Sequence, residues 1–376
     1  MTRSTADTIV VGGGLIGCAL AAELRERGQS VLVLERGEPG AEASSAAAGL
    51  LSPQSDARAR DALFELGAES LALYPGWTAR LSEETGLDCG FRRAGLLRCA
   101  FSETERESLA AAYGWQGAEG LGVELRSGEA LERDRDELSL APGVRAALLF
   151  ADEAAVNPRA LSRAAWLTAE RRGAAVRAGV AVRRFVLERG RCVGVETDEG
   201  AFTAGAVVDA AGAWAAFDLG LPFPVPVRPV RGQIVALRVE GFVPARIVCS
   251  EDVYVLPRAD GTVLIGSTLE TVGFRKAVTA GAVARLLEGA VRLLPRLAGA
   301  RFEDAWSGLR PGTPDGWPIL GESPVPGLFF AAGHFRSGIL LAPATARLVA
   351  DAIGGVRAPA MSAFSIERFA GRLSVS

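Results

Sequence analysis

The residues best suited to chemistry near the start of the chain are three spaced glycines and one acid. Gly12, Gly14 and Gly17 form a G-x-G-x-x-G pattern, and Glu35 follows 23 residues after Gly12. In a dinucleotide-binding turn the first glycine permits a tight turn, the second lets the backbone approach a pyrophosphate, and the third lets helix and strand pack closely. The later acid accepts hydrogen bonds from a ribose diol. The spacing therefore predicts an adenine-dinucleotide site.

A strand, a helix and a second strand must hold these residues, and the sequence predicts all three. Residues 8–11 read TIVV, residues 15–27 have helical spacing, and residues 31–34 form another apolar run. The helix N-terminus at Leu15 and Ile16 would present free N–H groups and a partial positive charge to the phosphates. A glycine-rich turn in an ordinary α/β protein would not explain the acid at position 35.

Bulk composition narrows the classes of function. The 376 residues carry a net charge of −3, so the basic surplus of a nucleic-acid binder is absent. Five scattered cysteines without a C-x-x-C pair and a single histidine favour a reduced, cytoplasmic protein without a metal site. No signal peptide precedes the first strand, and no apolar run reaches the ~18–20 residues that span a membrane. We expect a soluble chain.

Strand and helix signals of the α/β type return far downstream. Asn157-Pro158 begins a predicted helix to about residue 172, residues 180–187 and 192–197 read as paired strands, and residues 206–214 and 328–333 are apolar strands. Residues 222–305 alternate like an antiparallel sheet. We expect an α/β plus antiparallel β fold. We predict a Rossmann-like dinucleotide-binding domain of residues 1–84, 146–221 and 306–376, and an inserted, mostly antiparallel substrate domain of residues 85–145 and 222–305.

The choice of flavin adenine dinucleotide (FAD) over NAD rests first on a loop of small residues. This loop follows Glu35 and Arg36 and runs to Leu51. Backbone of this kind can lie against a flat, extended cofactor, and Ser44 and Ser45 can hydrogen-bond phosphate or ribityl oxygens. NAD enzymes have no evident need for such a segment. A flexible surface loop is the alternative interpretation.

Four later motifs point the same way as this opening: residues 227–233 (VRPVRGQ), 252–258 (DVYVLPR), 308–316 (GLRPGTPDG) and 333–343 (GHFRSGILLAP). Through these motifs the chain resembles, over nearly its whole length, the FAD-dependent D-amino-acid oxidase family, and within it glycine oxidase of thiazole biosynthesis. The last two motifs are the most specific. The resemblance implies FAD as cofactor and suggests a homotetramer. The chain lacks the C-terminal cysteine that sarcosine oxidases attach to flavin, so noncovalent binding is expected.

The glycine pattern and the resemblance together identify the expected cofactor contacts. In this interpretation the backbone around His334 contacts the ring system and the histidine is not a base. A helix from Ser337 to about Ile353 is expected to point its positive end at the flavin. The expected cofactor-binding residues are Gly12, Gly14, Leu15, Ile16, Gly17, Glu35, Arg36, Ser44, Ser45, Ala48, Gly49, Leu50, Val182, Gly212, His334, Arg336, Ser337, Gly338, Ile339 and Leu340.

Three residues are expected to bind the substrate, and none to hold a metal. Arg310 matches the arginine of the family that binds the substrate carboxylate, and its guanidinium offers the planar pair of donors that a carboxylate accepts. Tyr254 would close over the same carboxylate from an alternating strand, where it shares a face with Leu256 and Arg258. Arg336 would line the pocket, and Leu269, where glycine oxidases often have methionine, would alter its volume.

The expected function is oxidative deamination of glycine and other small amines, such as sarcosine and small D-amino acids, by hydride transfer to FAD. The products are an imine or 2-oxo acid, ammonia and hydrogen peroxide, and the partners are the small amino acid and oxygen. In the resembled pathway the imine feeds the thiazole ring of thiamine. A D-amino-acid or D-proline dehydrogenase passing electrons to a quinone or another acceptor is the alternative. An NAD-linked dehydrogenase and a non-catalytic nucleotide-binding module rank lower.

Overall fold

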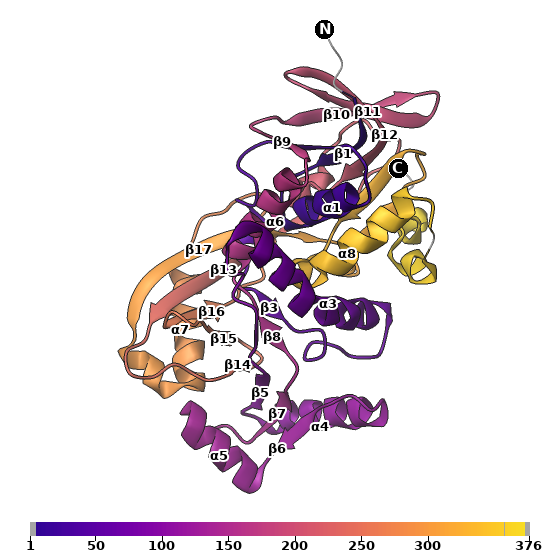
Figure 1. The fold of residues 1–376 in the computed structure, drawn as a ribbon. Helices are drawn as coiled ribbons and strands as arrows, with labels where there is room; N and C mark the ends of the chain where they lie inside the picture. The colour runs from indigo at the N-terminus through magenta and orange to yellow at the C-terminus, as the bar shows by residue number, and fades with distance from the viewer. Residues whose placement is uncertain (1–4, 357, 373–376) are drawn as a thin grey trace.

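Two eight-stranded sheets dominate the computed structural model, which describes residues 5–356 and 358–372 (Figure 1). The first sheet contains β10 (Val182–Glu188), β11 (Arg191–Thr197), β12 (Gly200–Asp209), β1 (Thr5–Val11), β2 (Val31–Glu35) and β9 (Ala175–Ala178) in that order, with β19 (Leu328–Ala332) beside β12 and β18 (Ile319–Glu322) beside β19. Strands β1, β2, β9, β12 and β19 run parallel. Their carboxyl ends therefore share one edge of the sheet, where ligands of such folds bind.

Apolar residues explain why this sheet is buried. Ile9 and Val10 on β1 are fully buried, as are Val207 and Val208 on β12, so both faces of the sheet are covered. Helices α1 (Leu15–Glu26), α6 (Pro158–Arg171) and α8 (Gly338–Ile353) pack together on one face, and α3 (Ala62–Thr85) lies against α6 and α8. Asn157 caps α6 as predicted, since its side chain accepts hydrogen bonds from the N–H groups of Arg159 and Ala160.

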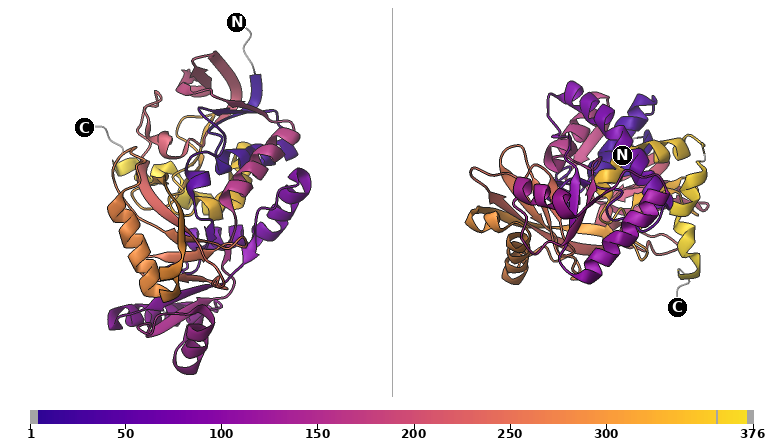
Figure 2. Two further views of the ribbon diagram at one scale, coloured as in Figure 1. Left: turned by 90° about the vertical axis from the view of Figure 1, so that its left-hand side faces the viewer. Right: turned by 90° about the horizontal axis from the view of Figure 1, so that it is seen from below.

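The second sheet is mostly antiparallel, as the alternation of residues 222–305 predicts. Its order is β17 (Arg301–Gly312), β13 (Arg228–Arg238), β16 (Thr262–Gly266), β15 (Tyr254–Pro257), β14 (Ile247–Cys249), β5 (Leu96–Ala100), β7 (Ala146–Phe150) and β6 (Glu124–Arg126), and only β14 and β5 pair in parallel. Helix α7 (Ala280–Leu293) packs on β13 and β16. Helices α4 (Glu103–Ala118) and α5 (Gly128–Leu138) lie at the end of this sheet far from the N-terminus (Figures 1 and 2).

Short elements join the two sheets. Strands β3 (Leu50–Leu51), β8 (Ala154–Ala155) and β4 (Arg92–Arg93) form a small sheet of their own, and α2 (Ala43–Ala46) precedes β3. The 3₁₀ turns are η1 (Gly212–Ala216), η2 (Pro295–Gly299), η3 (Pro359–Phe364) and η4 (Ile366–Arg372). In the described part of the chain, no helix has the length and hydrophobicity needed to cross a membrane.

The sheets and the predicted domain limits differ at two places. Strand β7 and residues 306–312 of β17 belong to the antiparallel sheet, whereas the predicted limits put both in the FAD-binding domain. Pairing with distant strands is the reason: β7 pairs with β5 from Ala146↔Ala100 to Phe150↔Leu96, and β17 pairs with β13 as far as Gly312↔Arg228. The division into domains otherwise stays a prediction.

A proline inside α8 is compensated by α3. Pro343 has no N–H to donate to the carbonyl of Ile339, and that oxygen instead accepts the hydroxyl of the fully buried Tyr74. Ser70 Oγ donates to the carbonyl of Leu340 at 2.6 Å and accepts the N–H of Ala344 at 3.3 Å. Helix α3 thereby holds the first turn of α8.

We expect Tyr74→Phe to lower the free energy of unfolding by about 1–2 kcal/mol, because the buried carbonyl of Ile339 loses its donor. Urea unfolding of the purified protein measures this change. Tyr113→Phe is the matched control, since Tyr113 is 42% exposed and its hydroxyl can bond to water. Equal stability losses in the two variants would contradict the role given to Tyr74.

Candidate functional site

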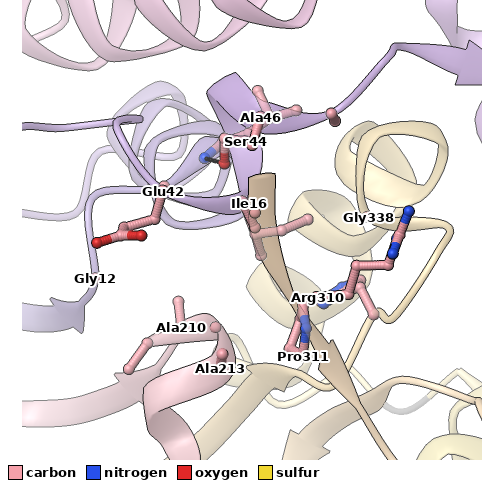
Figure 3. A pocket seen from close by; sticks show the side chains of 18 of the residues that line it. Gly12, Ile16, Glu42, Ser44, Ala46, Ala210, Ala213, Arg310, Pro311 and Gly338 are labelled. Carbon is pink, nitrogen blue, oxygen red and sulfur yellow. Dashed lines mark hydrogen bonds between the residues drawn. The ribbon is translucent and has the colours of Figure 1, made fainter. Parts of the chain in front are cut away.

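A cavity of about 360 Å³ lies where the carboxyl edge of the parallel sheet meets one face of the antiparallel sheet. Figure 3 shows four separated stretches of chain around it: Gly12 to Ala46 near the N-terminus, Ala210 and Ala213 after β12, Arg310 and Pro311 on β17, and Gly338 at the start of α8. Chain segments that are hundreds of residues apart therefore build one site.

The glycine turn after β1 has the geometry that its pattern predicts. Gly12 has a φ of +107°, and a Cβ atom on Gly17 would lie 2.0 Å from the carbonyl oxygen of Gly12, so this packing excludes any larger residue at position 17. A Cβ atom on Gly14 would find only Ser44 Oγ within 4 Å, at 3.3 Å. The backbone of Gly14 therefore borders the cavity with room for a phosphate group.

Glu35 lies beside this turn at the end of β2. Its Oε2 accepts the N–H of Gly13 at 2.7 Å, and its Oε1 accepts the N–H of Gly37 at 2.8 Å. Each carboxylate oxygen can accept a further hydrogen bond, which leaves capacity for a ribose diol. Next to it, the Cζ atom of Arg36 lies 3.6 Å from the ring centroid of Trp214.

The two serines of the small-residue loop have different positions. Ser44 lines the cavity, and its Oγ accepts the N–H of Leu15 at 2.9 Å, at the N-terminus of α1. Ser45 does not line the cavity, because its hydroxyl donates to the carbonyl of Gly40 within the same loop. The structure therefore gives no support to the cofactor contact expected of Ser45.

Arg258 fixes the far end of this loop against the antiparallel sheet. Its guanidinium donates to the carbonyl of Ala48 at 2.6 Å and to the carbonyl of Val156. Burial lowers the pKa of Arg258 to about 10, which leaves the side chain charged at neutral pH. Trp306 Nε1 adds a bond to the carbonyl of Ala46 at 3.0 Å. The backbone that borders the cavity is thus held from the other sheet.

The opposite side of the cavity is formed by the segment that leads into α8. His334 is 3% exposed, and its Nε2 lies 3.1 Å from Thr345 Oγ1. Burial lowers the pKa of His334 to about 3, so the imidazole is neutral at physiological pH. Ser337, Gly338 and Ile339 line the cavity at the helix N-terminus, whose partial positive charge favours electron-rich groups.

Arg310 and Tyr254 reach the cavity from the face of the antiparallel sheet. The Arg310 guanidinium donates to Ser267 Oγ at 2.7 Å and to the carbonyl of Thr268 at 3.0 Å. No ion pair of Arg310 with an acidic side chain is found among the described residues. Burial lowers the pKa of Arg310 and raises that of Tyr254, while their proximity opposes both shifts. A partly buried guanidinium that lines a cavity without a counter-charge can accept a carboxylate as its partner.

Two glycines make room for these side chains on neighbouring strands. A Cβ atom on Gly232 of β13 would lie 2.1 Å from Arg310 Nη1, and one on Gly266 of β16 would lie 2.2 Å from the Tyr254 hydroxyl oxygen. Gly266 pairs with Tyr254 in the sheet, so the tyrosine side chain crosses over it. Both long side chains therefore lie flat across the strands, toward each other.

Most of the predicted site residues meet at this cavity. Every expected cofactor-binding or substrate-binding residue lines it except Gly17, which packs against Gly12, and Ser45. Leu269, expected to alter the pocket volume, is 55% exposed and does not line the cavity. Several lining residues were not predicted from the sequence, among them Ser52, Asp56, Ala211, Trp214, Phe217, Ile234 and Ser267. The small-residue turn after β12 was the available signal for Ala211 and Trp214.

We expect the imidazole of His334 to stay neutral from pH 8 to pH 5, because burial disfavours its charged form. His334 is the only histidine, so protein carrying ¹³C-labelled histidine gives a single imidazole signal to follow by NMR. The pKa of His334 in the folded protein lies below the ordinary 6.5. Its titration therefore lowers the free energy of unfolding as the pH falls from about 6.5 toward 3. A signal that titrates with a midpoint near pH 6.5 would overturn this assignment.

Comparison with known proteins agrees with the geometry of the site. A family model described as FAD dependent oxidoreductase matches residues 7–352. The chain is 38% identical to the bifunctional protein ThiO/ThiG of Trichormus variabilis over 99% of its own length, and it spans 56% of that relative. It is 36% identical to the glycine oxidase of Geobacillus kaustophilus over 98% of both chains.

A solved glycine oxidase structure is also similar to this chain over nearly its whole length. The crystal structure of glycine oxidase from Geobacillus kaustophilus superposes with a TM-score of 0.92 and 37% identity, covering 97% of this chain and 99% of the other. The fold class expected from the sequence is confirmed by this likeness. The small residues, the two helix N-termini and Glu35 fit a bound dinucleotide. The chain therefore belongs to the FAD-dependent oxidoreductase family, and its cofactor is FAD.

Proposed function

We propose that this protein catalyses the oxidative deamination of glycine and of other small amines, such as sarcosine and small D-amino acids. The products are the imine or 2-oxo acid, ammonia and hydrogen peroxide. The observation that carries the proposal is the partly buried Arg310 guanidinium, which lines the cofactor cavity with two hydrogen bonds to neutral oxygens and no ion pair among the described residues. A substrate carboxylate supplies the missing negative charge.

Arg310 and Tyr254 together orient the substrate in this proposal. The guanidinium makes a forked contact with the two carboxylate oxygens. The raised pKa of Tyr254 keeps its hydroxyl protonated at neutral pH, so it donates a further hydrogen bond. The carboxylate then fixes where the α-carbon lies. Such positioning is a large part of what an enzyme contributes to a two-reactant step.

No side-chain base is required for the proposed reaction. When the amino acid binds as the free amine, loss of hydride from the α-carbon gives the protonated imine directly, and no proton has to leave the substrate first. His334 is unsuited to accept a proton because burial lowers its pKa to about 3, which makes it a weak base, and its Nε2 faces Thr345. Bound FAD supplies the hydride acceptor and, with oxygen, the route to hydrogen peroxide. The protein's own residues bind, orient and shield the substrate.

The relatives support this choice of substrate. A glycine oxidase matches over 98% of both chains, whereas the chain spans about half of the bifunctional ThiO/ThiG relatives. A role in thiamine synthesis, with the imine as the product that is passed on, is part of the proposal. We also propose a cytoplasmic homotetramer that acts on a small amine and oxygen. A dehydrogenase that passes electrons to a quinone or another acceptor is the second candidate.

We expect Arg310→Ala to lose about 3–5 kcal/mol of transition-state stabilisation for glycine, because one member of a buried charge pair is removed. Steady-state kcat/KM from peroxide release measures this loss. Arg310→Lys should also lose activity, since an ammonium group cannot make the forked contact. Arg301→Ala is the control on the same strand, with a side chain 71% exposed. An unchanged kcat/KM in Arg310→Ala would refute the carboxylate site.

A further inference from the structure

A second arginine lines the same cavity, but its charge is already neutralised. Arg336 Nη2 lies 3.0 Å from Asp56 Oδ2, and both side chains are about half exposed, at 53% and 55%. Both residues also line the cavity. The pair therefore lies at the mouth of the cavity, whereas Arg310 is only partly exposed.

The two guanidinium groups influence each other. Repulsion by Arg336 contributes to the lowered pKa of Arg310, although burial is the larger cause. A ligand in the cavity therefore experiences both positive charges. Asp56 neutralises the charge of Arg336 and leaves the charge of Arg310 available for a carboxylate.

Glu153 and Arg98 hold the backbone just before Asp56. Glu153, 1% exposed in the turn between β7 and β8, accepts the N–H groups of Gln54 at 3.0 Å and Ser55 at 2.7 Å, and the hydroxyl of Ser52. Arg98 Nη1 adds a bond to the carbonyl of Ser55 at 2.6 Å. The residues just before Asp56 are thus held by strand β5 and by the turn that follows β7. These bonds fix the backbone from which the Asp56 side chain reaches Arg336.

We propose that Asp56 sets the charge preference of the substrate site. By pairing with Arg336 it prevents that arginine from binding a second acidic group, and its own charge repels such a group at the mouth. The site then favours amino acids with one carboxylate over those with two. Glu153 acts as a positioning residue, through the backbone of residues 54 and 55. This inference rests on the proposed amine oxidation at the same site.

Sarcosine and iminodiacetate are the matched substrates for a test. Both are secondary amines built on glycine, and iminodiacetate differs by a carboxylate in place of a hydrogen on the N-methyl group. We expect Asp56→Asn to raise the ratio of kcat/KM for iminodiacetate over sarcosine by about five- to tenfold at low salt. The gain should shrink at high ionic strength, because charges at an open mouth are screened. Asp152→Asn removes an exposed acid that pairs with Arg93 and does not line the cavity, and it is the control.

The anchor is tested by two changes at one position. Glu153→Gln keeps an oxygen that accepts the N–H groups of Gln54 and Ser55, so its substrate ratio should stay near that of the wild type. Glu153→Ala removes the acceptor and should shift the ratio in the direction of Asp56→Asn. A merely structural role would lower both kcat/KM values together and leave their ratio unchanged.

A binding experiment separates this inference from the proposed function. Acetate and malonate, one carboxylate against two, are titrated into each holoenzyme while the flavin absorbance is followed, and no turnover is needed. Tighter malonate binding in Asp56→Asn with unchanged acetate binding supports the inference even if the wild type oxidises no amine. Ratios that stay within about twofold of the wild type in both the kinetic and the binding experiments overturn it.

Discussion

The positive charge of Arg310, which is partly buried and has no acidic partner among the described residues, is the constraint on which the site depends. Removing a charged group from water is costly unless other groups compensate. Here Ser267 Oγ and the carbonyl of Thr268 hold the guanidinium, and the glycine at position 232 gives it the space to lie across the sheet. Only an anionic ligand completes its surroundings. This arrangement supports the proposed carboxylate site beside the cofactor.

The two sheets contribute different parts of this cavity. The parallel sheet gathers the ends of β1, β2, β12 and β19 at one edge, which suits an extended dinucleotide. The antiparallel sheet presents a flat face on which Arg310 and Tyr254 lie. Arg258 and Trp306 bind the backbone of the loop between them, at Ala48 and Ala46. A rigid connection of this kind keeps the substrate side aligned with the cofactor side.

Much of this arrangement could be predicted because it is encoded locally. The strand, helix and strand around Gly12 follow from hydrophobic spacing. The predicted alternation along β15 is confirmed, since Val253 and Val255 are buried in one hydrophobic core and Leu256 is buried in another. Partnerships between distant segments could not be predicted. Glu153 accepts hydrogen bonds from residues about 100 positions earlier in the chain, and Tyr74 donates one to a helix carbonyl 265 positions later. Ser44 and Ser45 have the same chemistry, and only the path of the backbone directs one to the cavity.

In the proposed reaction, a small amino acid held by Arg310 is oxidised by bound FAD, and oxygen then reoxidises the reduced flavin. Anaerobic mixing of the holoenzyme with glycine, sarcosine and D-alanine, followed by admission of air, tests this most directly. We predict loss of the flavin absorbance with glycine and rapid recovery in air, with hydrogen peroxide released. Loss of absorbance without recovery in air would assign the protein to the dehydrogenases. No loss of absorbance with any of the three amines would contradict the account.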